Sequence, residues 1–123
     1  MINHIERLER TLSGEKPDRI PCALWQHFPV DDQHPSSLAK AILAFQEQFD
    51  FDFVKITPHS SFCLKDWGVI DEWQGHVEGT RAYLHRPIKS PDDWYQLSPL
   101  DPTKGHLGKQ LECVAKLQKS LPK

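Results

Sequence analysis

Two short apolar runs, one on each side of a single amphipathic stretch, constrain the fold of this chain more than any other feature. The runs are residues 20–25 (IPCALW) and residues 51–57 (FDFVKIT), and both have the length of a β-strand. Between them, from about Ser37 to Phe49, apolar side chains recur at helical spacing, namely Leu38, Ile42, Phe45 and Phe49. This order predicts two adjacent parallel strands joined by a right-handed crossover helix.

The rest of the pattern adds helices but too few strands to complete a sheet. Turn and capping residues predict four further elements: a helix over residues 2–12, a hairpin around residues 77–88, a short helix from Ser90 and a last helix from Asp101. Two parallel strands cannot form a sheet that is covered on both faces and free of long edges. The expected fold class is therefore α/β, with residues 1–123 as one domain whose parallel sheet is incomplete.

The composition is that of an ordinary soluble domain and excludes several classes of protein. Of the 123 residues, 38% are hydrophobic and 26% are charged, and the formal net charge is −2. Lysine and arginine are scattered, with no run that could displace counterions from phosphates, so we expect no nucleic-acid partner. No stretch approaches the ~20 apolar residues needed to span a bilayer, so we expect no membrane partner.

The cysteines and the N-terminus indicate a cytoplasmic protein. The three cysteines form no CxxC motif, and three thiols cannot all pair with one another. This favours reduced thiols at Cys22, Cys63 and Cys113. The first residues, MINHIERLERTL, carry a charge every few positions and have no continuous apolar region of the kind found in signal peptides.

Two polar stretches directly after the predicted strands are the candidate site. In βα folds, functional groups gather just past the C-terminal ends of the strands, and here that rule selects residues 25–32 and 57–61. Histidine can exchange a proton near neutral pH, so we expect His27 and His59 to be catalytic and to point into one cavity. The neighbouring groups expected to bind substrate are Trp25, Gln26, Asp31 and Asp32.

Other interpretations of the same residues remain open. His27, Asp31, Asp32 and His34 could hold a metal ion, but a polar loop with this composition is commoner without one, so we expect no metal. Asp31 and Asp32 could equally form a turn or a helix cap. His59 could be a solvated loop residue, and the tryptophans are more typical of packing than of ligand stacking.

Three segments of the sequence, taken in order, resemble the N-terminal part of uroporphyrinogen decarboxylase family proteins. RLERTLSGEKPDRIPCALW resembles the family's opening helix and its Asp-Arg-x-Pro entry into the first barrel strand. FQEQFDFDFVKITP resembles the second strand with the helix end before it, and RPIKSPDDWYQLSPLDP resembles a later segment with a capped short helix. The resemblance covers essentially the whole chain and implies an incomplete N-terminal portion of a TIM-like (β/α)8 barrel, a fold of typically ~250 residues.

The resemblance also implies an enzyme. Family members that act on uroporphyrinogen III remove its acetate carboxyls without a cofactor, so we expect a carboxy-lyase for a porphyrinogen-like or other carboxylated small molecule, with no cofactor. The complete protein could form a homodimer. The family holds its substrate with arginines after the first strand and an aspartate after the second. Residues 26–30 of this chain (QHFPV) lack that arginine signature, and His59 stands in place of the aspartate, so neither family residue carries over.

Two alternatives follow from these departures. The superfamily also contains corrinoid-dependent methyltransferases, which lack the arginine signature and whose zinc ligands lie in the half of the barrel that this sequence does not contain. The chain could also be a truncated fragment without activity. In either barrel interpretation, apolar side chains meant for absent neighbours should be partly exposed, including those of Phe53, Ile56, Leu111 and Leu117.

Overall fold

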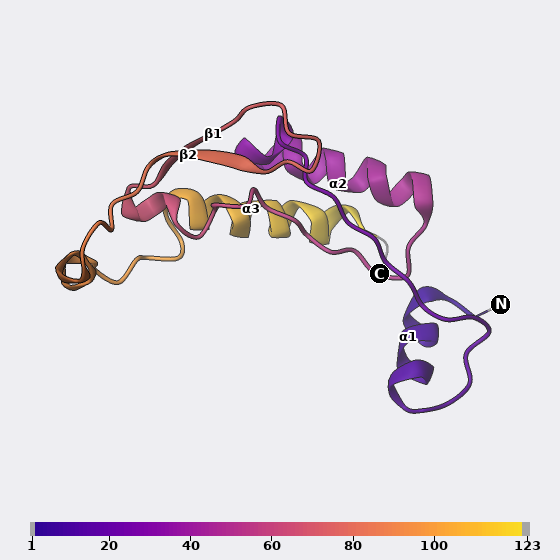
Figure 1. Ribbon diagram of the computed structural model, residues 1–123. Helices are drawn as coiled ribbons and strands as arrows, with labels where there is room; N and C mark the ends of the chain where they lie inside the picture. Colours follow the sequence, from indigo (N-terminus) through magenta and orange to yellow (C-terminus); the bar gives the residue numbers. More distant parts are fainter. Residues whose placement is uncertain (1, 122–123) are drawn as a thin grey trace.

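Three α-helices, three short 3-10 helices and one small hairpin make up the regular structure of residues 2–121, which are the residues that the computed structural model describes. The longer helices α2 and α3 lie side by side and run in the same direction, whereas α1 lies apart at one end of the molecule (Figure 1). No helix in this part of the chain is long and apolar enough to cross a membrane. The elements are α1 (His4–Leu12), η1 (Asp31–Gln33), α2 (Pro35–Phe49), η2 (Lys65–Trp67), β1 (Ile70–Trp73), β2 (Arg81–His85), η3 (Pro91–Gln96) and α3 (Gly105–Ser120), where η marks a short 3-10 helix.

Local capping interactions set the limits of α1. The side chain of Asn3 accepts a hydrogen bond from the backbone N–H of Glu6 at 2.8 Å, which satisfies one of the free N–H groups of the first turn. Glu6 also accepts a hydrogen bond from Arg10 one turn later at 2.6 Å. Gly14 follows the helix with a φ of 76°, a left-handed conformation that suits glycine. The helix predicted over residues 2–12 is confirmed.

Helix α2 is the predicted crossover helix, and it begins slightly earlier than expected. Pro35 occupies its first turn, where a missing N–H costs nothing. The helix ends at Phe49 because Asp50 adopts a left-handed conformation with a φ of 51° and donates its backbone N–H to the carbonyl of Gln46 at 2.8 Å.

Helix α3 begins at Gly105 and not at Asp101, where the sequence predicts its start. Asp101 instead closes a local turn by accepting hydrogen bonds from the backbone and hydroxyl of Thr103. The free N–H groups of the first turn of α3 are capped from η2, because the carboxylate of Asp66 accepts from His106 N at 2.9 Å and Leu107 N at 3.0 Å. A carboxylate at a helix N-terminus also interacts favourably with the helix dipole.

The hydrophobic core lies between α2 and α3. Its buried members are Leu38, Ala39, Ile42, Cys113 and Leu117, and partly buried apolar side chains surround them, namely Phe28, Leu43, Val54, Ile56 and Leu121. The C-terminal half of α3 therefore faces α2 with Cys113 and Leu117. Val54 and Ile56 bring the second apolar run against the same core.

The two predicted strands are not regular strands, and that prediction is wrong. Among the described residues, one backbone hydrogen bond joins the two runs, from Asp52 N to Cys22 O at 3.0 Å. The ammonium group of Lys55 also lies 3.6 Å from the centre of the Trp25 ring. The runs therefore lie next to each other and in parallel, as expected, but without a ladder. Pro21 has no N–H to contribute, and a parallel pair without further neighbours has few hydrogen bonds to hold its register.

The sheet that does form is the antiparallel hairpin of β1 and β2. Its strands are 70–73 and 81–85, so the hairpin begins earlier than the predicted residues 77–88. Asp71 pairs with Tyr83 and Trp73 pairs with Arg81, which places Asp71 and Arg81 as diagonal neighbours. Both residues of this diagonal pair belong to the candidate site described below.

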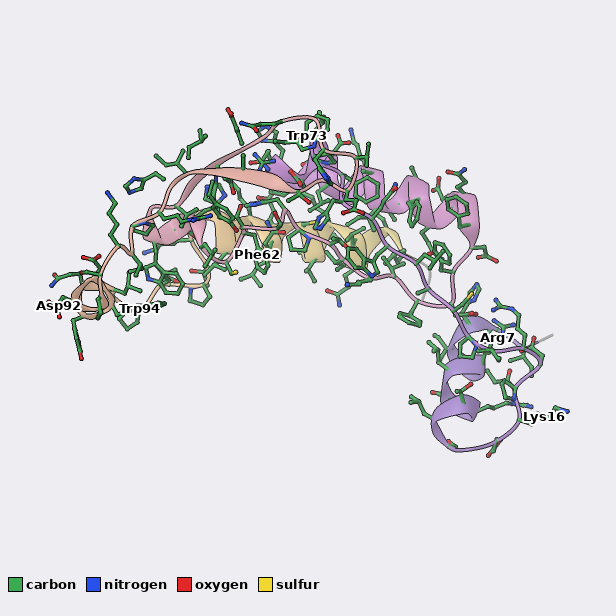
Figure 2. The ribbon with its side chains drawn as sticks, viewed as in Figure 1. Arg7, Lys16, Phe62, Trp73, Asp92 and Trp94 are labelled. Carbon is green, nitrogen blue, oxygen red and sulfur yellow. The ribbon has the colours of Figure 1, made fainter. Side chains whose placement is uncertain are left out.

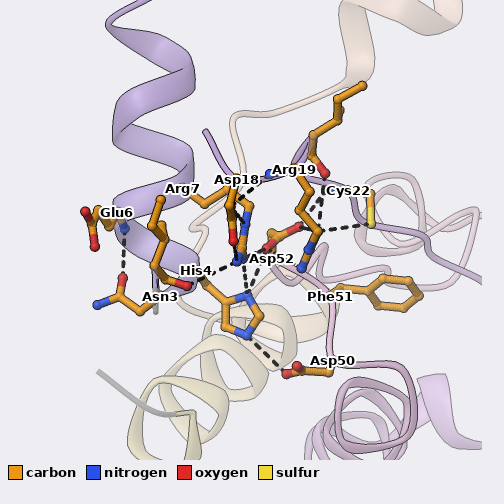
Figure 3. A network of polar contacts seen from close by, with 12 residues as sticks. Asn3, His4, Glu6, Arg7, Asp18, Arg19, Cys22, Asp50, Phe51 and Asp52 are labelled. Atoms are coloured by element: carbon orange, nitrogen blue, oxygen red, sulfur yellow. Dashed lines mark hydrogen bonds and ion pairs between the residues drawn. The ribbon is translucent and has the colours of Figure 1, made fainter. Parts of the chain in front are cut away.

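A network of charged groups around Asp52 ties α1 and both apolar runs together (Figure 3). The buried carboxylate of Asp52 accepts hydrogen bonds from Arg7, Arg19 and His4 at 2.5, 2.5 and 2.9 Å and from the backbone N–H of Cys22 at 2.8 Å. Burial raises the pKa of Asp52, but these donors outweigh it and hold the pKa well below its usual range. Arg7 also donates two hydrogen bonds to Asp18, at 2.7 and 2.8 Å.

Several large apolar side chains are exposed. Phe53 is 48% exposed and Leu111 is 52% exposed, whereas Ile56 is partly buried. Leu117 is 1% exposed, so its expected exposure is wrong, because it packs against α2 in the core. Trp94 is also exposed, at the end of the molecule away from α1 (Figure 2).

Replacing the buried carboxylate should destabilise the fold much more than replacing its exposed neighbour. Asp52→Asn leaves the surrounding cations without their counter-charge, and breaking a buried pair in this way costs about 3 kcal/mol or more. Asp50→Asn is the matched control, since Asp50 also contacts His4 but its side chain is 82% exposed against 0% for Asp52. Urea unfolding monitored by circular dichroism measures both variants. Equal, small losses would show that Asp52 does not hold α1 in place.

The exposed apolar surface should make the protein self-associate. Contiguous apolar patches of more than a few hundred Å² are rare on monomers. Sedimentation velocity at increasing protein concentration should therefore show a rising average mass. A monodisperse monomer that unfolds in one sharp transition would contradict this expectation.

Candidate functional site

Six largely buried side chains meet in the interior and form what we call the interior cluster. They come from five separate parts of the chain: η1, the turn after the second apolar run, η2, β1 and β2. The members are Asp32, His59, Ser61, Lys65, Asp71 and Arg81. Burying this many polar groups is unfavourable unless they pair with one another, so their contacts decide what the cluster can do.

Asp71 is the centre of the cluster. One carboxylate oxygen accepts from Lys65 Nζ at 2.8 Å and from Arg81 Nε at 3.0 Å, and the other accepts from the hydroxyl of Ser61. Burial raises the pKa of Asp71, but hydrogen bonds from Lys65, Ser61 and Arg81 outweigh it and lower the pKa to about 2. Asp71 is therefore ionised at neutral pH.

His59 lies behind Ser61 and is almost completely enclosed. Its Nδ1 is 3.1 Å from the Ser61 hydroxyl oxygen, and its ring packs edge-on against those of Phe62 and His106. Burial lowers the pKa of His59 to about 4, against the opposing effect of the Asp71 charge. The imidazole is therefore neutral at neutral pH.

Arg81 connects this arrangement to the loop after the first apolar run. Its Nη1 is 3.9 Å from Asp32 Oδ1, and Asp32 also accepts from Gln33 at 2.6 Å. Burial raises the pKa of Asp32. Within residues 2–121, three buried atoms in this region have no hydrogen-bond partner: His27 Nδ1, Asp32 Oδ2 and Arg81 Nη1. Unpaired buried polar atoms are rare in proteins, and their concentration here indicates a place where a polar ligand group can bind.

An open hollow of about 430 Å³ adjoins this region. Its lining residues are Trp25, Gln26, His27, Val77, Glu78 and Thr80. The hairpin turn closes tightly over His27, since a Cβ atom on Gly79 would lie 2.4 Å from the His27 Cβ. Gly79 has a φ of +74°, so the turn needs glycine there both for its conformation and for this close approach.

The predicted site residues divide into two groups. Trp25, Gln26 and His27 line the hollow, whereas Asp32 and His59 belong to the interior cluster. His27 lines this hollow and His59 does not. Asp31 lies in η1, partly buried, and its carbonyl closes the turn by accepting from His34 N. No group of three potential ligand side chains in residues 2–121 is placed to hold a metal ion.

Three members of the interior cluster were not predicted from the sequence: Lys65, Asp71 and Arg81. Ser61 lies within the predicted stretch 57–61 but was given no role of its own. One signal could have found the central pair. Asp71 and Arg81 carry opposite charges in two short segments, VIDEW and RAYL, which contain several apolar or aromatic residues and flank a glycine-containing turn. This is the pattern of a cross-strand ion pair.

Acid should destabilise the protein through His59. Its pKa is about 4 in the folded state and 6.5 ordinarily, so the folded state binds this proton less readily than the unfolded state. The resulting stability is fully present above pH 6.5 and is lost as the pH falls from 6.5 to 4, a contribution on the order of 3 kcal/mol. Urea unfolding between pH 4 and 7 should show a shallower pH dependence for His59→Gln than for the wild type.

His4 provides a control of opposite sign. The hydrogen bond to Asp52 raises the pKa of His4, so its contribution is present below pH 6.5 and is lost as the pH rises through the folded-state pKa. His4→Gln should therefore steepen the loss of stability on acidification. An unchanged pH dependence in His59→Gln would mean that the folded state accepts a proton on His59 without cost.

Comparison with protein-family models, with curated proteins and with solved structures finds no match to this chain. The geometry of the interior cluster and the hollow beside it is therefore the basis on which a function can be argued. That geometry combines an ionised aspartate, an arginine with an unpaired N–H group and two histidines within one part of the molecule.

Proposed function

We propose that this chain forms the N-terminal part of a uroporphyrinogen decarboxylase-type barrel enzyme, a carboxy-lyase for a porphyrinogen-like or other carboxylated small molecule. One observation carries the proposal: polar groups that follow the two parallel apolar runs meet in the interior cluster. Asp32 follows the first run and His59 follows the second, and Arg81 and Asp71 connect them. Functional groups of (β/α) enzymes gather at this end of the strands.

The arrangement of the helices supports the barrel part of the proposal. α2 connects two runs that lie side by side and in parallel, and α3 packs against α2 in the same direction (Figure 1). Successive helices on the outside of a (β/α) barrel have this relation, because every strand runs the same way and every helix returns antiparallel to it. The exposed side chains of Phe53 and Leu24 then lie where further barrel elements would cover them.

Arg81 supports the choice of a carboxylated substrate. The loop after the first run has no arginine, but β2 brings the Arg81 guanidinium to Asp32 of that loop. Asp71 accepts a hydrogen bond from the Nε of Arg81, and Nη1 has no hydrogen-bond partner although it lies 3.9 Å from Asp32 Oδ1. A guanidinium presents paired N–H donors that match the two oxygens of a carboxylate, so Arg81 is suited to bind one carboxyl group of the substrate.

The histidines and Asp32 are suited to the proton transfer of a decarboxylation. When a carboxyl group leaves as CO2, the bonding electron pair stays on carbon and takes up a proton. His27 borders the hollow, and an imidazole can deliver a proton near neutral pH. Asp32 is the candidate for a second donor, and burial raises the pKa of its carboxyl group. We assign to His59, which lies deeper than His27, the role of a buried base that accepts a proton.

The reaction that the protein catalyses distinguishes this proposal from the methyltransferase alternative. The natural protein that contains this sequence should remove carboxyl groups from uroporphyrinogen III or a smaller carboxylated analogue, measured as CO2 release. Methyl transfer from a methyl-corrinoid to a thiol, without CO2 release, would instead favour the methyltransferase alternative. Absence of both activities would favour an inactive fragment.

Arg81→Gln should lower kcat/KM for the carboxylated substrate by roughly 10- to 100-fold, the value of a hydrogen bond to a charged group. Arg81→Lys keeps the charge and the pairing with Asp71 but loses the paired donors, so it should recover stability more than activity. Arg86→Gln is the matched control, since Arg86 is exposed and lies over the ring of Tyr83. Equal activity in the wild type and both Arg81 variants would refute the binding role.

A further inference from the structure

The hydrogen bonds around Ser61 determine which nitrogen of His59 carries a proton. A serine hydroxyl has one hydrogen to donate and lone pairs with which to accept. Ser61 contacts two groups: the Asp71 carboxylate on one side and His59 Nδ1 on the other. Because an ionised carboxylate can only accept, the Ser61 hydrogen is committed to Asp71.

The direction of the second contact follows from the first. With its hydrogen committed to Asp71, Ser61 can only accept from His59, so Nδ1 must be the protonated nitrogen. Asp71 stays ionised because Lys65 and Arg81 both donate to its other oxygen. His59 has one N–H when neutral, so Nε2 then carries the lone pair. Among the described residues, no hydrogen bond engages Nε2.

We propose that Ser61 is a positioning residue that, held by Asp71, keeps the proton of His59 on Nδ1 and leaves Nε2 as its basic nitrogen. This role of His59 in proton transfer rests on the proposed function, but the proton position itself does not. In a folded protein, the hydrogen bond made by one ring nitrogen sets which of the two nitrogens carries the proton. The groups that surround His59 are Asp71 on β1, Arg81 on β2, Lys65 on η2 and His106 on α3.

Nitrogen-15 NMR of the imidazoles tests the proposal directly, because protonated and unprotonated ring nitrogens have well-separated chemical shifts. The uniformly labelled protein is measured at neutral pH, and His59→Gln identifies the His59 signals among those of the seven histidines. The expected result is a protonated Nδ1 and an unprotonated Nε2. A wild-type His59 with its proton on Nε2, or with a proton on both nitrogens, would overturn the proposal.

Two serine variants separate positioning from simple packing. Ser61→Ala removes the acceptor, so the His59 nitrogens should shift toward the opposite or a mixed tautomer. Ser61→Thr keeps a hydroxyl and should restore the wild-type shifts, even if the larger side chain costs stability. A wild-type tautomer that persists in Ser61→Ala would overturn the role of Ser61. Turnover is measured separately. A wild-type protein that does not decarboxylate the substrate would refute the proposed function, whereas the NMR shifts test the proton position independently of turnover.

Discussion

The buried carboxylate of Asp52 is the interaction on which the arrangement of the N-terminal half depends. α1 has few apolar contacts with the helices of the core and lies apart from them (Figure 1). Its place is set by Arg7 and His4, which donate to Asp52 at 2.5 and 2.9 Å. The same carboxylate accepts from Cys22 N, and through that bond it holds the first apolar run beside the second. One buried carboxylate thus holds together two runs that no strand ladder joins.

The interior cluster uses the same principle around a second aspartate. Asp71 pairs with Lys65 and Arg81, and through Ser61 it also reaches His59. Buried ion pairs contribute little net stability compared with apolar packing, because desolvation offsets most of their attraction. A cluster of this kind therefore suggests a functional reason for its presence, and unpaired atoms at Arg81 and Asp32 lie at its edge. Among the described residues, no side chain of the network around Asp52 has a buried polar atom without a hydrogen-bond partner.

Much of the helical structure could be predicted, and much of the candidate site could not. Asn3 and Gly14 mark the limits of α1 through interactions within a few residues, so their meaning is readable from neighbours in the sequence. His59 and Asp32 were predicted as polar groups after the two apolar runs, but their burial was not. Arg81 was missed because its partners Asp71 and Asp32 come from other elements, and the hairpin that carries it has no strong periodicity.

The sequence by itself determined α1, α2, the start of η3 and the neighbouring, parallel course of the two apolar runs. Each of these follows from local capping or from the short reach of a strand–helix–strand unit. Only the tertiary structure decided that these runs would lack a ladder, that Asp66 would cap α3 from η2, and that Asp71 and Arg81 would meet beside Asp32. The physical reason is distance along the chain: a cap or a helical face is set by residues three or four positions apart, whereas these contacts form only after the core has brought remote segments together.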